Sequence, residues 1–249
     1  MAFIIGMNLV IDIGNSRIKL AVFQSGKIMQ QGLIGRNDFI PSLNKIKSDF
    51  PKIKALLVSH VGKMENEWQK FLDTNFRTIY FPNDLGLPFK NSYETKSTLG
   101  ADRIALVAAA QLHFPKKNVL VIDAGTCITY DFLNKNGEYL GGAISPGIHM
   151  RLRAVHTFTE KLPLVEAVGE SVYIGTSTEK SLRSGAVLGA SLEIDGFIAL
   201  YRKDFENLTV ILTGGDRQLL SKTIKNSIFA PSNFLLEGLN AILEFNQTQ

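Results

Sequence analysis

The strongest constraint on the fold is a pattern of strand, Asp-x-Gly turn and returning strand that occurs twice. The first copy contains Asp12 and Gly14, and the second contains Asp123 and Gly125. Glycine can take positive φ and lets a ligand approach the backbone, which suits the binding of a phosphate group. A single Asp-x-Gly turn usually only reverses the chain. Its recurrence favours an internal duplication over two coincidental hairpins.

The repeat extends beyond the turns. Gly26, within Ser25-Gly26, follows Asp12 at the same spacing as Gly137, within Asn136-Gly137, follows Asp123, and both dipeptides are hairpin signals. Each copy is therefore predicted to form a three-stranded antiparallel meander. We predict an α/β protein with two similar halves, residues 1–116 and 117–249, on either side of a cleft.

Composition narrows the class of protein. The 249 residues are 45% hydrophobic and 20% charged, enough to bury a sizeable core. The net charge of +4 comes from scattered lysines, which predicts solvated surfaces and no nucleic-acid partner. The single cysteine, Cys127, excludes an internal disulfide and fits the cytoplasm, and the four histidines lack metal-site spacing. We expect neither a signal peptide nor a membrane span.

Between the two copies lie a predicted helix over residues 38–50, capped by Asn37, and an irregular stretch, 82–99, that contains Tyr93. The segment Gly100-Ala101-Asp102-Arg103 then opens an alanine-rich helix. Its carboxylate and guanidinium groups allow two interpretations from the residues alone. They are either ordinary charged side chains of a first helical turn or part of a substrate site.

Two groups of glycines in the second half predict close approach of backbone. Gly141, Gly142 and Gly147 flank a proline turn, which is either purely structural or packed against a ligand. Gly214 and Gly215 separate a strand from a helix, where their amide groups suit a nucleotide's sugar or phosphate.

A long helical segment is predicted to begin at Ser177 and Thr178. It contains Gly185, Gly189 and Gly196, and the first two are one helical turn apart. This spacing favours close helix packing at a domain or subunit contact.

In their order and spacing, five motifs make the chain resemble the type III pantothenate kinases: Asp12-x-Gly14-Asn15-Ser16, Gly100-Ala101-Asp102-Arg103, Asp123-x-Gly125-Thr126, Gly141-Gly142-x-Ile144-x-Pro146-Gly147 and Thr213-Gly214-Gly215-Asp216. The resemblance implies the actin-like ATPase fold with two ribonuclease H-like halves, a homodimer, ATP with Mg²⁺, and a monovalent cation, K⁺ or NH₄⁺. The implied reaction is phosphorylation of pantothenate to 4'-phosphopantothenate, the first step of coenzyme A biosynthesis.

The resemblance also implies site residues. ATP would be bound by Asp12, Gly14, Asn15, Ser16, Lys19, Gly125, Thr126, Gly214 and Gly215. Pantothenate would be bound by Tyr93, Gly100, Ala101, Asp102, Arg103 and Thr178, with Asp102 as the catalytic proton acceptor. Asp123 would hold the monovalent cation. We expect Asp12 to position Mg²⁺ through water, because Mg²⁺ prefers few carboxylates and several waters.

The chain departs from the family pattern at Ser16, where threonine is more frequent, and at Ser177, where asparagine is more frequent. Two alternatives stay open. The first alternative is a catalytically weak nucleotide-binding accessory or regulatory protein of the same family, and the second is another small-molecule kinase of the superfold. The intact segment from Gly100 to Arg103, together with Tyr93, favours the pantothenate kinase, because ATP binding alone does not need it.

Overall fold

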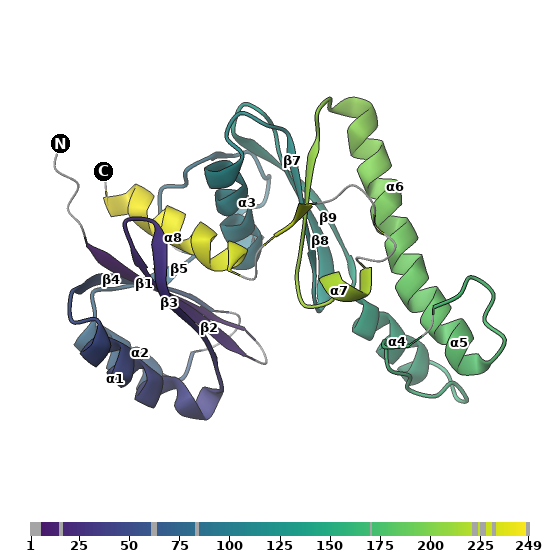
Figure 1. Cartoon of the computed structure of the whole chain (residues 1–249), viewed down its shortest axis with the longest axis horizontal. Coiled ribbons are helices and arrows are strands. Elements are labelled where there is room, and N and C mark those ends of the chain that lie inside the picture. Colours follow the sequence, from purple (N-terminus) through teal and green to yellow (C-terminus); the bar gives the residue numbers. More distant parts are fainter. Residues whose placement is uncertain are drawn as a thin grey trace. The chain divides into compact units, whose positions relative to one another are not determined.

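The computed structural model describes residues 6–14, 17–60, 64–82, 85–169, 171–220, 224, 228–230 and 233–247. The chain divides into two compact units (Figure 1). Unit 1 consists of Met1–Lys90, Thr95–His113 and Asn233–Gln249, and unit 2 consists of Asn91–Glu94 and Phe114–Ser232. The helix at residues 234–247 thus belongs to unit 1, whereas the predicted boundary had assigned it to the second half.

Unit 1 is built on a five-stranded sheet in the order β3-β2-β1-β4-β5. β1 runs antiparallel to β2 and parallel to β4, and β5 continues the parallel part. Its elements are β1 (Met7–Ile13), β2 (Ile18–Gln24), β3 (Lys27–Ile34), the 3₁₀ turn η1 (Arg36–Asp38), α1 (Phe39–Asp49), β4 (Ile53–His60), α2 (Asn66–Asn75), β5 (Thr78–Phe81), the 3₁₀ turn η2 (Lys96–Thr98), α3 (Ala101–His113) and α8 (Phe234–Gln247).

Unit 2 is built on a sheet in the order β11-β10-β7-β8-β9-β6, with β6 (Lys90–Asn91) at one edge. Its other elements are β7 (Val119–Ala124), β8 (Cys127–Leu133), β9 (Glu138–Pro146), α4 (Ile148–Thr157), α5 (Thr178–Arg183), the π-helical turn η3 (Ser184–Leu188), α6 (Gly189–Asp204), β10 (Thr209–Thr213), α7 (Arg217–Leu220) and β11 (Ile228–Phe229).

The two sheets repeat one topology. The order β9-β8-β7-β10-β11 matches β3-β2-β1-β4-β5, with the same antiparallel meander and the same parallel strands. Gly26 and Gly137 both have φ of 73°, as the predicted hairpins require. The first Asp-x-Gly turn is one residue longer than the second, because Ile13 pairs with Ile18 whereas Ala124 pairs with Ile128. The predicted duplication of the meander is confirmed.

Helices cover both faces of the sheet in unit 1. α1 and α2 lie on one face, where Phe39 stacks on Trp68 with ring centroids 4.1 Å apart (Figure 1). α8 packs against β1, β2 and β4 on the other face, where Asn8 donates a hydrogen bond to Asn240 at 3.1 Å. Trp68 is therefore a core residue, as its helical spacing predicted.

α8 also packs closely on α3. A Cβ atom at Gly238 would lie 1.8 Å from the carbonyl oxygen of Ala105, so only glycine allows the two helices to approach this closely. The neighbouring residue of α8, Glu237, also contacts α3, because Nε2 of His113 lies 2.6 Å from its carboxylate oxygen. These contacts explain why the last helix belongs to unit 1.

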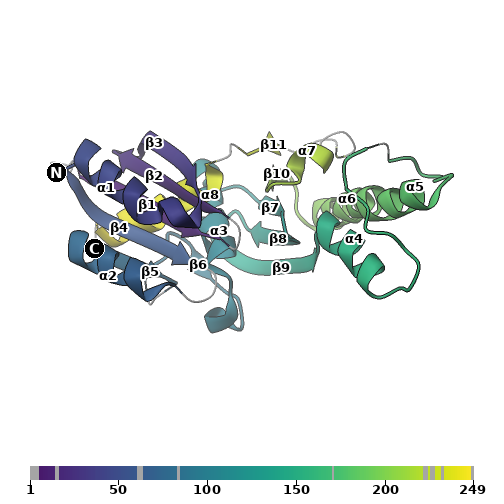
Figure 2. The same cartoon turned by 90° about the horizontal axis from the view of Figure 1, so that it is seen from below.

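In unit 2, α5, η3 and α6 follow one another as a single rod (Figure 2). This run, Thr178–Asp204, has 27 residues and contains an 18-residue window with a mean hydropathy of 1.2, enough to cross a membrane by length and composition alone, although the sequence had predicted no such segment. Its buried residues Ala190, Ile194 and Ile198 belong to the hydrophobic core of unit 2. One face of the run therefore packs on the core of unit 2, although only 33% of its apolar window is buried.

Two local predictions were wrong. Asn37 does not cap α1, because residues 36–38 form a 3₁₀ turn and Asp38 precedes the helix without a side-chain capping bond. The predicted proline turn also begins later than expected, since strand β9 continues to Pro146 itself. Cross-strand pairing of Cys127 with Pro146 keeps this segment in the sheet.

Candidate active site

Asp12 lies at the carboxyl end of β1, in the middle of a row of three polar side chains. Its cross-strand partners are Lys19 on antiparallel β2 and Ser59 on parallel β4. Parallel strands bring their carboxyl ends to one edge of a sheet, where ligands bind in open α/β folds. Ser59 is 2% exposed and donates a hydrogen bond to Asp12. The sequence analysis did not identify Ser59.

Burial raises the pKa of Asp12 above its usual value. The ammonium group of Lys19 lowers this pKa, the carboxylate of Asp102 raises it further, and the hydrogen bond from Ser59 lowers it. The effect of Asp102 means that the first turn of α3 lies within electrostatic range of Asp12. Unit 1 therefore brings the predicted Mg²⁺ residue and the predicted proton acceptor together.

The geometry of the first turn of α3 explains why residue 100, two positions before Asp102, is a glycine. Oδ1 of Asp102 accepts a hydrogen bond from the backbone N–H of Arg103 at 2.8 Å. A Cβ atom at Gly100 would lie only 2.4 Å from this oxygen. The carbonyl of Gly100 accepts the first helical hydrogen bond, from Ile104, at 3.2 Å. Gly100 thus leaves room for the carboxylate at a helix N-terminus, which favours its anion.

Arg103 is 5% exposed, which is unusual for a residue with a permanent charge. Its guanidinium group presents several N–H donors and accepts none, so it requires oxygen acceptors. Ala101 and Asp102 beside it are half-buried.

Gly14 does not adopt the positive φ that the sequence analysis gave as a reason for glycine in this turn. It is absent from the glycines of positive φ, and its N–H donates to the carbonyl of Arg17 at 3.1 Å. A Cβ atom at this position would lie 3.1 Å from the same carbonyl oxygen, so a tight turn accounts for the glycine. Asn15 and Ser16 lie outside the described residues.

Unit 2 repeats the row of polar side chains around Asp123, at the carboxyl end of β7. Its cross-strand partners are Thr129 on antiparallel β8 and Thr213 on parallel β10. Thr213 occupies the place that Ser59 has in unit 1. The chain then turns at Gly214, whose φ is +97°, and a Cβ atom there would lie 2.5 Å from Oδ1 of Asp123. The positive φ and the close approach both require glycine.

The Gly214–Gly215 turn leaves open space at its second residue. A Cβ atom at Gly215 would meet nothing within 4 Å. The next residue, Asp216, donates its N–H to the carbonyl of Ala124 at 2.9 Å and thereby joins this turn to the end of β7. Burial raises the pKa of Asp216, whereas the charge and hydrogen bond of His149, 3.5 Å away, lower it.

The Gly125–Thr126 turn is packed against the turn before α4. Gly147 donates its N–H to the carbonyl of Thr126 at 3.1 Å. A Cβ atom at Gly147 would lie 2.2 Å from the carbonyl oxygen of Gly125. The side chain of Thr126 is exposed, as a ligand contact would require. Gly147 therefore serves packing within the chain; ligand contact at this glycine remains a prediction.

Tyr93 belongs to unit 2 and packs on β9. Its ring stacks on Tyr139 with a centroid distance of 5.9 Å, and it fills the space over Gly141, where a Cβ atom would lie 3.2 Å from the ring. Tyr139 donates to Oδ1 of the fully buried Asp131 at 2.7 Å. Gly142 packs against the backbone of Tyr130. These glycines thus serve packing within unit 2.

Ser177 caps α5 as predicted. Its hydroxyl accepts a hydrogen bond from the N–H of Lys180 at 3.3 Å, and Thr178 is the first residue of the helix. The side chain of Thr178 is exposed.

The predicted site residues are divided between the two units. Unit 1 contains Asp12, Gly14, Lys19 and the segment 100–103, whereas unit 2 contains Tyr93, Gly125, Thr126, Asp123, Thr178, Gly214 and Gly215. Within each unit these residues gather at the carboxyl ends of the central parallel strands, apart from Tyr93 and Thr178. The residues that sequence reasoning missed are Ser59, His149, Asp131 and Tyr139.

A surface hollow of about 640 Å³ lies elsewhere, at the beginning of β7 and β10, where Asn118 and Thr209 line it. Ligands of open α/β sheets bind at the opposite, carboxyl ends of the strands. The loops after Asp12 and Asp123 are therefore better candidates than this hollow.

The part of the chain that the structure describes contains no group of three or more histidine, cysteine or acidic side chains that could enclose a metal ion. Asp12 nevertheless fits a Mg²⁺ ion that enters with ATP. Mg²⁺ uses one or two carboxylates and keeps several waters, and a divalent cation would relieve the repulsion between Asp12 and Asp102.

The chain resembles several solved structures over nearly its full length. A Baf family transcriptional activator from Campylobacter jejuni is 22% identical, with a TM-score of 0.65, and the match covers 97% of this chain and 100% of that one. The activator of 2-hydroxyisocaproyl-CoA dehydratase from Clostridium difficile is 15% identical, with a TM-score of 0.53, covering 98% of this chain and 97% of that one. The latter likeness and the duplicated sheets confirm the predicted actin-like ATPase fold.

Other proteins match this chain at much higher sequence identity. The type III pantothenate kinase of Christiangramia forsetii is 50% identical over 243 residues, which cover 98% of this chain and 100% of the relative. That of Flavobacterium johnsoniae is 45% identical over 239 residues, which cover 96% and 98%. The profile of the family described as type III pantothenate kinase matches residues 8–200. The chain therefore belongs to the type III pantothenate kinase family.

Proposed function

We propose that the protein phosphorylates pantothenate with ATP, giving 4'-phosphopantothenate and ADP for coenzyme A biosynthesis in the cytoplasm. The observation that carries this proposal is the placement of Asp102 at the N-terminus of α3 within electrostatic range of Asp12, in a chain of this family. A proton acceptor beside a phosphate-binding turn is what phosphoryl transfer to an alcohol needs.

In the proposed reaction, the primary hydroxyl oxygen of pantothenate bonds to the γ-phosphorus of ATP. The bond from that phosphorus to the bridging oxygen breaks, ADP leaves, and the hydroxyl proton passes to Asp102. Such a transfer depends mainly on in-line placement and on charge stabilisation, so a weak base is sufficient. Asp102 orients the hydroxyl and takes its proton late.

Other residues position the two substrates. The turns around Asp12 and Gly125, and the open Gly214–Gly215 turn, hold ATP through backbone N–H groups, with Lys19 and Thr126 as side-chain contacts. Bound Mg²⁺ would supply charge neutralisation at the phosphates, with Asp12 holding its water ligands. The buried guanidinium of Arg103 suits paired hydrogen bonds to the carboxylate of pantothenate.

Asp123 is proposed to hold a monovalent cation, K⁺ or NH₄⁺. Its carboxylate is half-buried at the end of β7, directly beside the Gly214 turn. A cation there would sit between two of the proposed ATP-binding turns of unit 2.

A homodimer is proposed through the α6 stripe, which we define as Gly185 of η3 together with Gly189, Leu192, Gly196 and Leu200 of α6. The three glycines would place a Cβ atom where nothing lies within 4 Å, and the two leucines are each 62% exposed. Apolar and backbone surface on one helix face suits close packing against a second copy. Cys127, a free thiol, fits the proposed cytoplasmic location.

The test is conversion of pantothenate by the purified protein with ATP and Mg²⁺, with and without K⁺, followed by mass spectrometry of the product. We expect 4'-phosphopantothenate and ADP in equal amounts, with faster turnover in K⁺. Nucleotide binding without any product would favour the accessory protein, and transfer to a different alcohol would favour another small-molecule kinase.

A further inference from the structure

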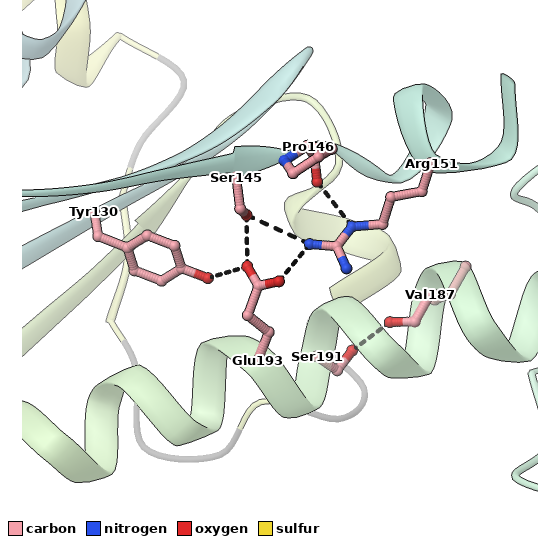
Figure 3. A network of polar contacts seen from close by, with 7 residues as sticks. All are labelled: Tyr130, Ser145, Pro146, Arg151, Val187, Ser191 and Glu193. Carbon is pink, nitrogen blue, oxygen red and sulfur yellow. Dashed lines mark hydrogen bonds and ion pairs between the residues drawn. The ribbon is translucent and has the colours of Figure 1, made fainter. Parts of the chain in front are cut away.

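Glu193, on α6 of unit 2, lies at the centre of a polar network (Figure 3). Its Oε1 atom accepts hydrogen bonds from the hydroxyl of Tyr130 at 3.0 Å and from that of Ser145 at 2.5 Å. Its Oε2 atom accepts from a guanidinium nitrogen of Arg151 at 2.5 Å. Glu193 thus connects β8, β9 and α4 to one position of α6.

The network holds the turn between β9 and α4. Nε of Arg151 donates to the carbonyl of Pro146 at 2.8 Å, so this side chain binds Glu193 and the turn at once (Figure 3). Ser145, the neighbour of Pro146, is bound to the same carboxylate. The residue after Pro146 is Gly147, whose N–H donates to Thr126.

The start of α4 also reaches the second ATP-binding turn that we propose in unit 2. His149, in the first turn of the helix, lies 3.5 Å from Asp216. The network around Glu193 therefore anchors a short segment, residues 145–151, that contacts both turns. Movement of this segment would disturb the Gly125–Thr126 turn, because Gly147 donates its N–H to the carbonyl of Thr126 and packs against the carbonyl groups of both residues.

We propose that Glu193 is a positioning residue for ATP binding, which acts through Arg151 and the Pro146–Gly147 turn on the Gly125–Thr126 turn. The inference rests on the proposed function, since it takes the Gly125–Thr126 turn as a phosphate-binding turn. Glu193 itself touches no substrate in this scheme. Its ion pair is a charge-assisted hydrogen bond with a partner that is 22% exposed, which favours a fixed geometry over a loose surface contact.

The test is Glu193→Gln, which keeps the shape and two acceptor contacts but removes the ion pair with Arg151. We expect the Kd for Mg·ATP, measured by calorimetry without pantothenate, and the KM for ATP to rise roughly tenfold, the effect of losing one charge-assisted hydrogen bond. The KM for pantothenate should stay close to that of the parent protein. Asp204→Asn is the matched control, because it removes an exposed charge from the same helix.

A second variant separates positioning from stability. Arg151→Lys can keep the charge pair with Glu193 but cannot also reach the carbonyl of Pro146, so it should weaken ATP binding in the same direction. The double variant, Glu193→Gln with Arg151→Lys, should lose little more affinity for Mg·ATP than the weaker-binding of the two single variants. Both changes break the same series of contacts from Glu193 to the Pro146–Gly147 turn. Ser145→Ala, a milder change, should weaken binding less, and it replaces Glu193→Gln if that variant does not fold.

A lower Tm of Glu193→Gln with an unchanged Kd for Mg·ATP would overturn the inference and leave a structural role. Additive losses in the double variant would also overturn it. These outcomes are distinct from failure of the proposed function, because ATP binding is measured without pantothenate. A protein that binds Mg·ATP but phosphorylates nothing would still test Glu193.

Discussion

Asp12 and Ser59 are direct neighbours across the parallel strands β1 and β4, and the hydroxyl of Ser59 donates to the Asp12 carboxylate. This bond does not compensate fully for burial, since the pKa of Asp12 stays raised. The free protein therefore keeps a carboxylate where its charge is destabilising, as binding sites often do.

Asp12→Asn should raise the Tm of the free protein by a few degrees and abolish most kinase activity. An amide removes the buried charge and its repulsion with Asp102, but it would no longer position Mg²⁺. Calorimetry without nucleotide and an activity assay check both parts. Asp195→Asn, an exposed position on α6, should change neither. A lower Tm for Asp12→Asn would contradict the argument.

Asp102→Asn should lower kcat by roughly 10² to 10⁴, the scale of a positioned acid or base. ATP affinity should hardly change, because the proposed ATP contacts come from other turns. If Asp102 only complements the helix dipole, its loss would cost about 0.3 to 1 kcal/mol of stability and leave turnover almost intact. Turnover, Mg·ATP affinity and Tm measured on one variant distinguish the two roles.

Asp123→Ala should remove the dependence on a monovalent cation together with most activity. The carboxylate of Asp123 is the anionic ligand that we propose at the end of β7. Turnover is measured against K⁺ concentration at constant ionic strength, with Asp204→Asn as the control. High activity that still responds to K⁺ would refute the assignment.

The α6 stripe predicts a dimer that one charge can disrupt. Leu192→Glu should give a monomer by light scattering at micromolar concentrations where the parent protein is a dimer, because it buries an unpaired charge in the contact. Leu112→Glu changes a similarly exposed leucine on α3 and should leave the dimer intact. A monomeric parent protein over this range would exclude the proposed assembly.

The pH dependence of stability should reflect Glu193. Burial raises the pKa of Glu193, but hydrogen bonds from Arg151, Ser145 and Tyr130 and the charge of Arg151 outweigh this and lower it below the ordinary 4.5. The ionised form is thus favoured in the folded state, so its contribution is complete above the ordinary pKa and is lost as pH falls through the lowered one.

The Tm difference between the parent protein and Glu193→Gln should therefore be greatest near neutral pH and shrink below about pH 4.5. Thermal melts across this range check the prediction. A Tm difference that is constant with pH would mean that the carboxylate's charge contributes nothing.

Local sequence signals predicted much of the fold. The meanders could be predicted from the hairpin turns at Gly26 and Gly137 and from the alternation of apolar and polar residues along the strands. Both signals depend only on residues that are close together in the sequence. The placement of α8 could not be predicted in this way. It depends on the packing of Gly238 against Ala105 and on the bond between Asn8 and Asn240, residues far apart in the chain.

Motifs alone were enough to propose Asp12, Asp102 and Asp123 as site residues, and their roles stay predictions. Ser59 was missed because its importance arises only from its register with Asp12. The glycines Gly141 and Gly147 were found, but the structure shows them packed against Tyr93 and the Gly125 turn. Sequence shows where the backbone must come close to something, not what it approaches.

The position of α8 bears on how the chain folds as it leaves the ribosome. Unit 2 is complete once residue 232 has been made, whereas unit 1 lacks the helix that covers one face of its sheet until residues 234–247 follow. The strands made first must therefore wait for the segment made last. Unit 1 therefore cannot complete its fold before the whole chain has been made, although its strands are made first.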